Sequence, residues 1–456
     1  GVDSSGWSED LNDNGFVAGL PKAIADGSIV CDRQTMTRLG EFGGRSYALW
    51  QAWFNGVGDM DYKHATVAQI GEVAADGTLS IVYRISEIDQ TDALAARMVE
   101  TDGALLLALK NTPQGMFVDA VMLAEDDVSI VFGFTRSYFH VDLERVGEAV
   151  AFLRQLVPRK PVSELFTVLG RAKQGKTERY REIMRHLARS DDRFVHAAGE
   201  RGLVMVCFTL PSLDVVFKLI RDRFAPPKAV LRQDVIDKYR FVFRHDRAGR
   251  LVDAQEFKRV RLPRARFSPE LVEELFTETA TTVHEDGDDL VFDHMYIERK
   301  MVPLNLYLRE ATGAAAARAV LDYGQAIRDL AYTNIFAGDL LLKNFGVTRH
   351  GRVIFYDYDE LCQVTDCRFR DVPEATSDED EMRGEAWFYV ADNDVFPETF
   401  LNFLAFSDEQ REVFLRAHGD ILTPDFWRGI QQRVQAGDLM EVLPYHPHRV
   451  RVASSA

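Results

Sequence analysis

The sequence predicts an α+β fold in two parts, a mainly helical domain over residues 1–190 followed by a bilobal domain over residues 191–456. Between residues 146 and 187, apolar residues recur at spacings of three and four, which is typical of helices. Past residue 195, short apolar runs bounded by Pro, Gly and Asp are typical of strands. The length of 456 residues also exceeds that of most single domains.

The first part carries a weak pattern before residue 100 and a clearer one after it. Residues 79–85 (LSIVYRI) alternate like a strand, and 105–110 and 116–122 predict two more strands around a Pro- and Gly-containing turn. The apolar run 129–134 predicts a further strand. The helices expected after it cover residues 146–157, which Pro158 ends, 163–169 and 178–187.

The second part begins with strands at residues 202–210 and 214–220, a helix at 234–244 and a strand at 290–297. This order is the one expected of the N-terminal lobe of a protein-kinase-like domain, which we place at about residues 191–300. The C-terminal lobe, about residues 301–456, is expected to open with a helix over 318–334. The apolar stripes of the two helices are Val235, Tyr239 and Val242, and Val320, Tyr323, Ile327 and Leu330.

The stretch 337–360 (AGDLLLKNFGVTRHGRVIFYDYDE) carries the strongest chemical signal. Asp339 and Asn344 form a D-x-x-x-x-N pattern, and a short strand over 353–356 leads to Asp357. In phosphotransferases of the protein-kinase type, one carboxylate accepts the proton of the attacking hydroxyl, while an Asn and a second Asp hold Mg²⁺ on the ATP phosphates. Each residue alone would be a cap or turn residue, but their joint spacing predicts catalytic Asp339, metal-binding Asn344 and Asp357, and a charge-balancing Lys343.

Two further features are predicted to contact ATP. Lys218 lies inside the apolar strand VVFKLI, where a lysine either reaches solvent from an edge strand or points toward a phosphate. The kinase-like order of the following elements favours the phosphate. The preceding segment AAGERGL contains two glycines that allow a backbone to approach phosphates, although G-x-x-G by itself is usually a turn. Its residues are Ala197, Ala198, Gly199, Glu200, Arg201, Gly202 and Leu203.

The segment 295–302 (MYIERKMV) has two equally weighted interpretations. It is either the hinge between the lobes, where the backbone meets adenine and Glu298 belongs to the cofactor site, or an exposed charge cluster around Glu298.

Composition excludes several classes of protein. The net charge of −17 argues against a general nucleic-acid binder, although it does not exclude a local basic patch. The most apolar run, residues 203–210, is too short to cross a membrane. The sequence shows no charged-then-apolar leader, so we expect no signal peptide. Cys362 and Cys367 form one C-x4-C pair with no second pair to complete a zinc site. Together with Cys31 and Cys207 they are interpreted as reduced thiols of a cytoplasmic protein.

The chain closely resembles bacterial isocitrate dehydrogenase kinase/phosphatase from about residue 129 to about residue 433. The long segments that carry the resemblance are SIVFGFTRSYF, KTERYREI, FTLPSLDVVFKLIRDRFAPPK, AGRLVDAQEF, MYIERKMVPLNLYL, NIFAGDLLLKNFGVTRHGRVIFYDYDE and DVFPETF. The resemblance implies an enzyme that phosphorylates a serine of isocitrate dehydrogenase and removes that phosphate, and so controls the branch between the tricarboxylic acid cycle and the glyoxylate bypass. The sequence leaves the oligomeric state open, with a homodimer as one alternative.

The resemblance also implies roles for single residues. Residues 197–203 cover the ATP phosphates, Lys218 contacts them, Asp339 is the kinase base, and Asn344 and Asp357 hold Mg²⁺. Asp253 corresponds to the phosphatase acid, although its own sequence context indicates only a surface or capping residue. The N-terminal domain is implied to be regulatory, with AMP or ADP as effectors near the domain junction. Candidate phosphate contacts there are Lys173, Lys176 and Thr177.

Two departures from ordinary protein kinases leave alternatives open. Ala337 and Gly338 replace the usual His-Arg before the catalytic Asp, and Tyr358 and Asp359 replace the usual Phe-Gly after the metal-binding Asp. Aminoglycoside and choline kinases share a G-D-x-x-x-x-N motif followed by an acidic pair, so a small-molecule phosphotransferase is the alternative function. A catalytically inactive scaffold that only binds isocitrate dehydrogenase is a third.

Overall fold

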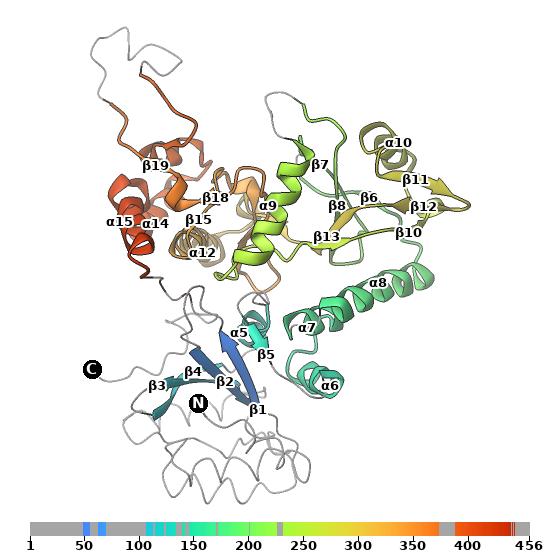
Figure 1. Ribbon diagram of the computed structural model, residues 1–456, viewed down its shortest axis with the longest axis horizontal. Helices are drawn as coiled ribbons and strands as arrows, with labels where there is room; N and C mark the ends of the chain where they lie inside the picture. Colours follow the sequence, from blue (N-terminus) through green and yellow to red (C-terminus); the bar gives the residue numbers. More distant parts are fainter. Residues whose placement is uncertain are drawn as a thin grey trace, which may run out of the picture. The chain divides into compact units, whose positions relative to one another are not determined.

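The structure is a computed structural model, and it describes residues 49–54, 63–69, 106–112, 115–122, 125–133, 139–141, 146–169, 172–199, 201–225, 231–373, 388–438, 440 and 442 (Figure 1). The chain divides into two compact units, residues 1–181 with 443–456, and residues 182–442. The expected strand at 79–85 and the predicted site residue Glu200 lie outside the described residues.

The first unit contains a five-stranded antiparallel sheet in the order β4-β3-β2-β1-β5. The strands predicted at 105–110 and 116–122 are confirmed as the paired β3 and β4. β1 and β2 fall in a stretch where the sequence pattern indicates no strand. The strands are β1 (Leu49–Phe54), β2 (Lys63–Gln69), β3 (Leu106–Thr112), β4 (Gly115–Met122) and β5 (Phe139–Val141).

The strand predicted at 129–134 is wrong, because Ser129 lies in helix α5 (Glu125–Val131). Val128 and Phe132 are both buried and stand four residues apart, on one face of a helical turn, and the Phe132 N–H donates to the Val128 carbonyl at 3.2 Å. A short apolar run does not distinguish a strand from a buried helix by periodicity. The other three predicted helices are confirmed as α6 (Val146–Leu156), α7 (Val162–Val168) and α8 (Ala172–Arg189).

The second unit begins with a five-stranded antiparallel sheet in the order β6-β7-β8-β13-β9. Its strands are β6 (Val195–His196), β7 (Met205–Thr209), β8 (Val215–Ile220), β9 (Gln255–Phe257) and β13 (Met295–Arg299). Helix α9 (Arg232–His245) runs beside this sheet (Figure 1). The predicted stripe of Val235, Tyr239 and Val242 is buried, and the Tyr239 ring stacks on Tyr296 of β13 at 4.0 Å between centroids.

The single strand predicted at 290–297 is two strands that belong to different sheets. β12 (Asp289–Phe292) pairs with β10 (Val260–Pro263) and β11 (Val283–Asp286), whereas β13 joins the five-stranded sheet. Asp293 and His294 separate the two strands. The Asp293 N–H donates a hydrogen bond to the Thr282 carbonyl at 2.9 Å, outside the regular strand pairing. The short helices η1 (Arg264–Arg266) and α10 (Pro269–Glu278) complete this region.

The rest of the second unit is mostly helical. The predicted helix at 318–334 is α12 (Gly313–Tyr332), and all four residues of its predicted stripe are buried. It packs against α14 (Asp408–His418) and β17 (Val353–Phe355). The remaining elements are β14 (Val302–Pro303), α11 (Leu304–Glu310), β15 (Ile335–Phe336), η2 (Leu342–Asn344), β16 (Phe345–Val347), β18 (Cys362–Gln363), η3 (Val364–Asp366), β19 (Arg368–Phe369), β20 (Asp394–Val395), η4 (Pro397–Phe403), η5 (Gly419–Leu422) and α15 (Pro424–Gln435).

Among the described residues, no helix has both the length and the apolar character needed to cross a bilayer.

Candidate active site

The loop that carries Asp339 begins with a glycine that no other residue could replace without strain. Gly338 has a φ of +77°, and a Cβ built on it would lie 2.4 Å from the Glu360 carbonyl oxygen. A side chain at this position, such as the arginine of ordinary protein kinases, would therefore clash with Glu360. The Asp339 carboxylate then accepts the Leu341 N–H at 2.9 Å, which fixes the side chain at the start of the loop.

Asn344 and Asp357 are brought together by the β16–β17 hairpin. Asn344, only 4% exposed, donates from Nδ2 to the Asp339 carbonyl at 3.3 Å. Its own carbonyl accepts the Tyr356 N–H at 3.1 Å, one residue before Asp357. The Lys343 carbonyl accepts the Tyr356 hydroxyl, while the Lys343 side chain is exposed. The spacing that singled out these residues therefore corresponds to a compact folded unit.

Lys218 reaches the same segment from the N-terminal lobe. Its Nζ lies 2.7 Å from Glu298 Oε1, donates to the Tyr356 carbonyl at 3.1 Å and sits 5.1 Å from the centre of the Tyr356 ring. β8 is an interior strand and Lys218 is 7% exposed, which excludes the edge-strand alternative. Burial lowers the pKa of Lys218, but the Glu298 and Asp357 carboxylates outweigh it, so the pKa is raised and the amine stays charged.

Glu298 takes the position of ion-pair partner that a glutamate of the adjacent helix holds in ordinary protein kinases. α9 instead turns Tyr239 and other apolar residues toward the sheet. Glu298 is 3% exposed, which excludes the exposed-cluster interpretation for this residue. Its carboxylate is 2.7 Å from Lys218 Nζ, so Glu298 takes part in the same cluster as the Tyr356 segment.

The segment 197–203 leads from β6 into β7. The Ala197 N–H donates to the Cys207 carbonyl at 3.0 Å, and the Gly202 carbonyl accepts from Arg221 Nε at 3.2 Å. Between these anchors Gly199 has a φ of +113°, which favours glycine. The side chains of Ala198, Arg201 and Leu203 are exposed, so the described residues between the two anchors face solvent.

Asp253 follows a segment that runs parallel to β17. Leu251 and Phe355 form a parallel bridge, with Arg250 O accepting the Phe355 N–H at 2.8 Å and Phe355 O accepting the Val252 N–H at 3.1 Å. Asp253 and Asp357 each stand two residues beyond this bridged pair. The two segments are joined again where the Tyr358 hydroxyl donates to the Val252 carbonyl at 2.6 Å. The fold thus places Asp253 and Asp357 at equivalent positions of two neighbouring parallel segments.

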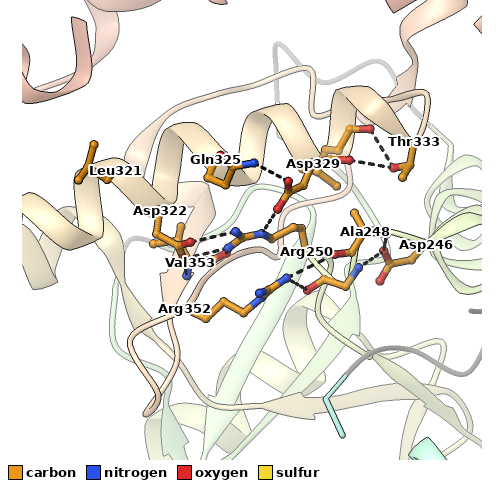
Figure 2. A network of polar contacts seen from close by, with 12 residues as sticks. Asp246, Ala248, Arg250, Leu321, Asp322, Gln325, Asp329, Thr333, Arg352 and Val353 are labelled. Carbon is orange, nitrogen blue, oxygen red and sulfur yellow. Dashed lines mark hydrogen bonds and ion pairs between the residues drawn. The ribbon is translucent and has the colours of Figure 1, made fainter. Parts of the chain in front are cut away.

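A buried arginine holds the Asp253 segment in place. Arg250, 1% exposed, donates from Nε to Asp329 Oδ2 at 2.7 Å and from Nη1 and Nη2 to the Asp322 carboxylate at 2.9 Å each. Nη1 also donates to the Val353 carbonyl at 2.9 Å. Figure 2 shows the guanidinium between the two aspartates of α12. Burial lowers the pKa of Arg250, but the two aspartates raise it overall.

The same network fixes the turn before Arg250. Asp246 Oδ1 accepts the N–H groups of Ala248 and Gly249 at 3.0 Å each, and Arg352 Nη2 reaches the Ala248 carbonyl at 3.4 Å (Figure 2). No sequence pattern marks Arg250 as a buried residue. A hydrophilic residue in the stretch AGRLVD carries no local signal of burial, because its partners are more than seventy residues away.

The residues present fit a magnesium–nucleotide site. Mg²⁺ is usually held by one or two protein carboxylates together with substrate phosphates, rather than by a complete protein cage. Among the described residues no group of three or more His, Cys, Asp or Glu side chains could hold a metal by itself. Asn344 and Asp357 would supply an amide and a carboxylate oxygen, with Asp359 two residues further along.

Comparison with known families gives two matches that together cover residues 94–447. Residues 192–447 match the model described as the kinase domain of isocitrate dehydrogenase kinase/phosphatase (AceK), and residues 94–191 match the model of its regulatory domain. The first match covers more than half of the 456-residue chain.

Individual relatives named "Isocitrate dehydrogenase kinase/phosphatase" give the same result. The chain is 57% identical over 341 residues to the protein of Anaeromyxobacter sp. (strain Fw109-5), with 75% of this chain and 59% of that protein covered. The protein of Anaeromyxobacter dehalogenans (strain 2CP-C) is 58% identical over 352 residues, which cover 75% of this chain and 60% of that protein. The protein of Xanthomonas campestris pv. campestris (strain 8004) is 52% identical over 341 residues, which cover 75% of this chain and 59% of that protein. The chain spans about three fifths of the length of these relatives.

Proposed function

The chain belongs to the isocitrate dehydrogenase kinase/phosphatase family, and on this premise we propose that it phosphorylates a serine of isocitrate dehydrogenase and also removes that phosphate. Such an enzyme would control the branch between the tricarboxylic acid cycle and the glyoxylate bypass. The observation that best supports one shared site is the parallel bridge that sets Asp253 beside the segment of Asp357. The family match does not favour the small-molecule phosphotransferase.

In the kinase direction, each proposed residue has a role that its position supports. Asp339, at the start of the loop, orients the serine hydroxyl and accepts its proton. Asn344 and Asp357 hold Mg²⁺, which neutralises charge on the ATP phosphates when bound. Lys218 donates to a phosphate, and the exposed Lys343 balances charge on the transferred group. The loop 197–203 covers the phosphates with its backbone. Most of the rate enhancement then comes from positioning and charge stabilisation.

In the phosphatase direction, we assign to Asp253 the orientation and activation of a water molecule. The Asp253 carboxylate accepts a hydrogen bond from Gln255 Nε2 at 3.1 Å, which restricts rotation of the Asp253 side chain. Its position beside the Asp357 segment allows it to act on a phosphoserine at the same magnesium–nucleotide site. The two activities would then share the phosphate position and differ in the carboxylate that handles the proton.

The domain assignment and the remaining ligands complete the proposal. A regulatory domain over residues 1–190 would act on a catalytic domain over 191–456, with lobes that meet near residue 300. AMP or ADP would bind to the regulatory part, where Lys173, Lys176 and Thr177 lie on α8. We place the protein in the cytoplasm, with no nucleic-acid or membrane partner. Light scattering in solution distinguishes a monomer from the homodimer that the sequence leaves open.

The kinase assignment is tested by replacing the proposed base. Asp339→Ala should lower phosphate transfer from labelled ATP to purified isocitrate dehydrogenase by about 10²–10⁴-fold, because general-base catalysis contributes on that order. Nucleotide binding, measured by calorimetry, should persist, since Asp339 is not proposed to contact ATP. Full retention of labelling would overturn the assignment.

The phosphatase assignment is tested on isocitrate dehydrogenase that already carries labelled phosphate. Asp253→Ala should abolish release of the label on addition of ADP or AMP, while transfer from ATP stays within about tenfold of the unchanged enzyme. Asp237→Ala, an exposed aspartate of α9, is a matched control. An equal loss of both activities in Asp253→Ala contradicts the separate role of Asp253.

A further inference from the structure

Two cysteines outside the proposed phosphotransfer machinery lie close enough to react with each other. The Sγ atoms of Cys362 and Cys367 are 3.5 Å apart and share a hydrogen bond. Both side chains are half-buried and therefore partly accessible to solvent. The bond length of a disulfide is about 2.05 Å, so closing the pair requires a movement of about 1.5 Å, within reach of side-chain rotation.

The backbone around the pair is held at both ends. β18 pairs with β15, and Cys362 stands opposite Phe336. The Cys367 N–H donates to the Val364 carbonyl at 3.2 Å, which closes the turn of η3. Gln431 Nε2 of α15 donates to the Val364 and Cys367 carbonyls at 2.8 Å each. The short distance between the sulfur atoms is therefore a property of the packed C-terminal lobe.

The surroundings distinguish the two thiols. The hydrogen bond from Cys367 lowers the pKa of Cys362 despite partial burial, with help from Lys238. The same hydrogen bond and burial raise the pKa of Cys367. A thiol with a lowered pKa is the better attacking group in thiol–disulfide exchange, and a neighbouring thiol resolves the mixed disulfide. Cys207 differs, because burial raises its pKa to about 11.

We propose that Cys362 and Cys367 form a thiol–disulfide exchange site that reacts with small disulfides such as oxidised glutathione and closes to an intramolecular disulfide. The Cys362 thiolate attacks one sulfur of oxidised glutathione, and the first glutathione leaves as a thiolate. Cys367 then attacks the Cys362 sulfur, which releases the second glutathione. The two protons lost by the cysteines go to the released thiolates, and two electrons reduce oxidised glutathione to two glutathione molecules.

The site can be tested by mass spectrometry without measuring enzyme activity. Trypsin is expected to release both cysteines in one peptide, residues 353–368 (VIFYDYDELCQVTDCR). The folded protein is incubated with oxidised glutathione, remaining thiols are alkylated, and the digest is analysed. We expect this peptide to lose about 2 Da and to escape alkylation, while the peptide of Cys207 stays alkylated. Because no phosphate transfer is measured, the result is independent of the proposed function.

The single variants test the order of the two steps. Cys367→Ser should retain one glutathione on Cys362, because the resolving thiol is absent. Cys362→Ser should react several-fold more slowly. The proposal is overturned when the unchanged protein shows only glutathione adducts, shows alkylated thiols at excess oxidised glutathione, or loses 2 Da only after unfolding in urea. The assay on the unchanged protein decides the question even when a variant does not fold.

Discussion

Lys218 and Arg250 are both buried cations that reach the short segment before Asp357, yet their surroundings differ. Lys218, from the N-terminal lobe, pairs with one carboxylate, that of Glu298, and donates to the Tyr356 carbonyl. Arg250 pairs with two carboxylates of α12 and donates to the Val353 carbonyl. One cation therefore contacts the segment one residue before Asp357, and the other contacts it four residues before.

This difference separates a cation that can move to contact a ligand, Lys218, from a cation that is fixed within the fold, Arg250. The guanidinium of Arg250 is planar and uses four hydrogen bonds to fasten three parts of the chain, so its movement would break the fold. The ammonium of Lys218 sits on a flexible stem, and it can turn toward a phosphate while remaining near Glu298. Burial of a charged side chain is thus not by itself a sign of catalysis.

The largest expected effect comes from removing the structural cation. Arg250→Met leaves Asp322 and Asp329 without their shared partner, and breaking a buried ion pair from one side typically costs about 3–5 kcal/mol. Urea unfolding should show this loss of stability. The triple variant Arg250→Met, Asp322→Leu, Asp329→Leu, which also removes the carboxylates, should recover part of it. An Arg250→Met protein as stable as the unchanged one contradicts the structural role.

Removal of Lys218, the proposed phosphate contact, should lower activity even when folding is restored. Lys218→Met should lower both phosphate transfer and phosphate release by about 10²–10³-fold, because a donor aimed at developing charge is lost. The double variant Lys218→Met, Glu298→Gln serves as the control for the buried carboxylate left behind: its unfolding midpoint should lie near that of the unchanged protein, with activity still low. Recovery of activity in the double variant would show that Lys218 acts only through Glu298.

The smallest expected effect is a dependence of the free energy of unfolding on pH in the acidic range. Burial raises the pKa of Asp322, but Arg250 outweighs it and holds the pKa below the ordinary value of 3.8. The resulting stabilisation is complete above pH 3.8 and is lost as the pH falls through the lower pKa of the folded protein. The stability difference between the unchanged protein and Arg250→Met should therefore shrink at acidic pH. A difference that stays constant between pH 7 and pH 3 would contradict this linkage.

Local patterns predicted much of the second unit. The stripes of α9 and α12 and the strands β7 and β8 follow from apolar periodicity, since each element buries one face and its period appears in a short window. The wrong strand at 129–134 and the merged strand at 290–297 are short apolar runs, for which periodicity carries too little information.

By itself, the sequence predicted that Asp339, Asn344 and Asp357 lie close together, because they belong to one loop and hairpin where spacing along the chain limits distance in space. Only the tertiary structure decided that Glu298 pairs with Lys218, that Arg250 anchors the Asp253 segment, and that this segment runs parallel to β17. These contacts join residues about 70 to 105 positions apart, where pairing depends on how the elements pack rather than on local pattern.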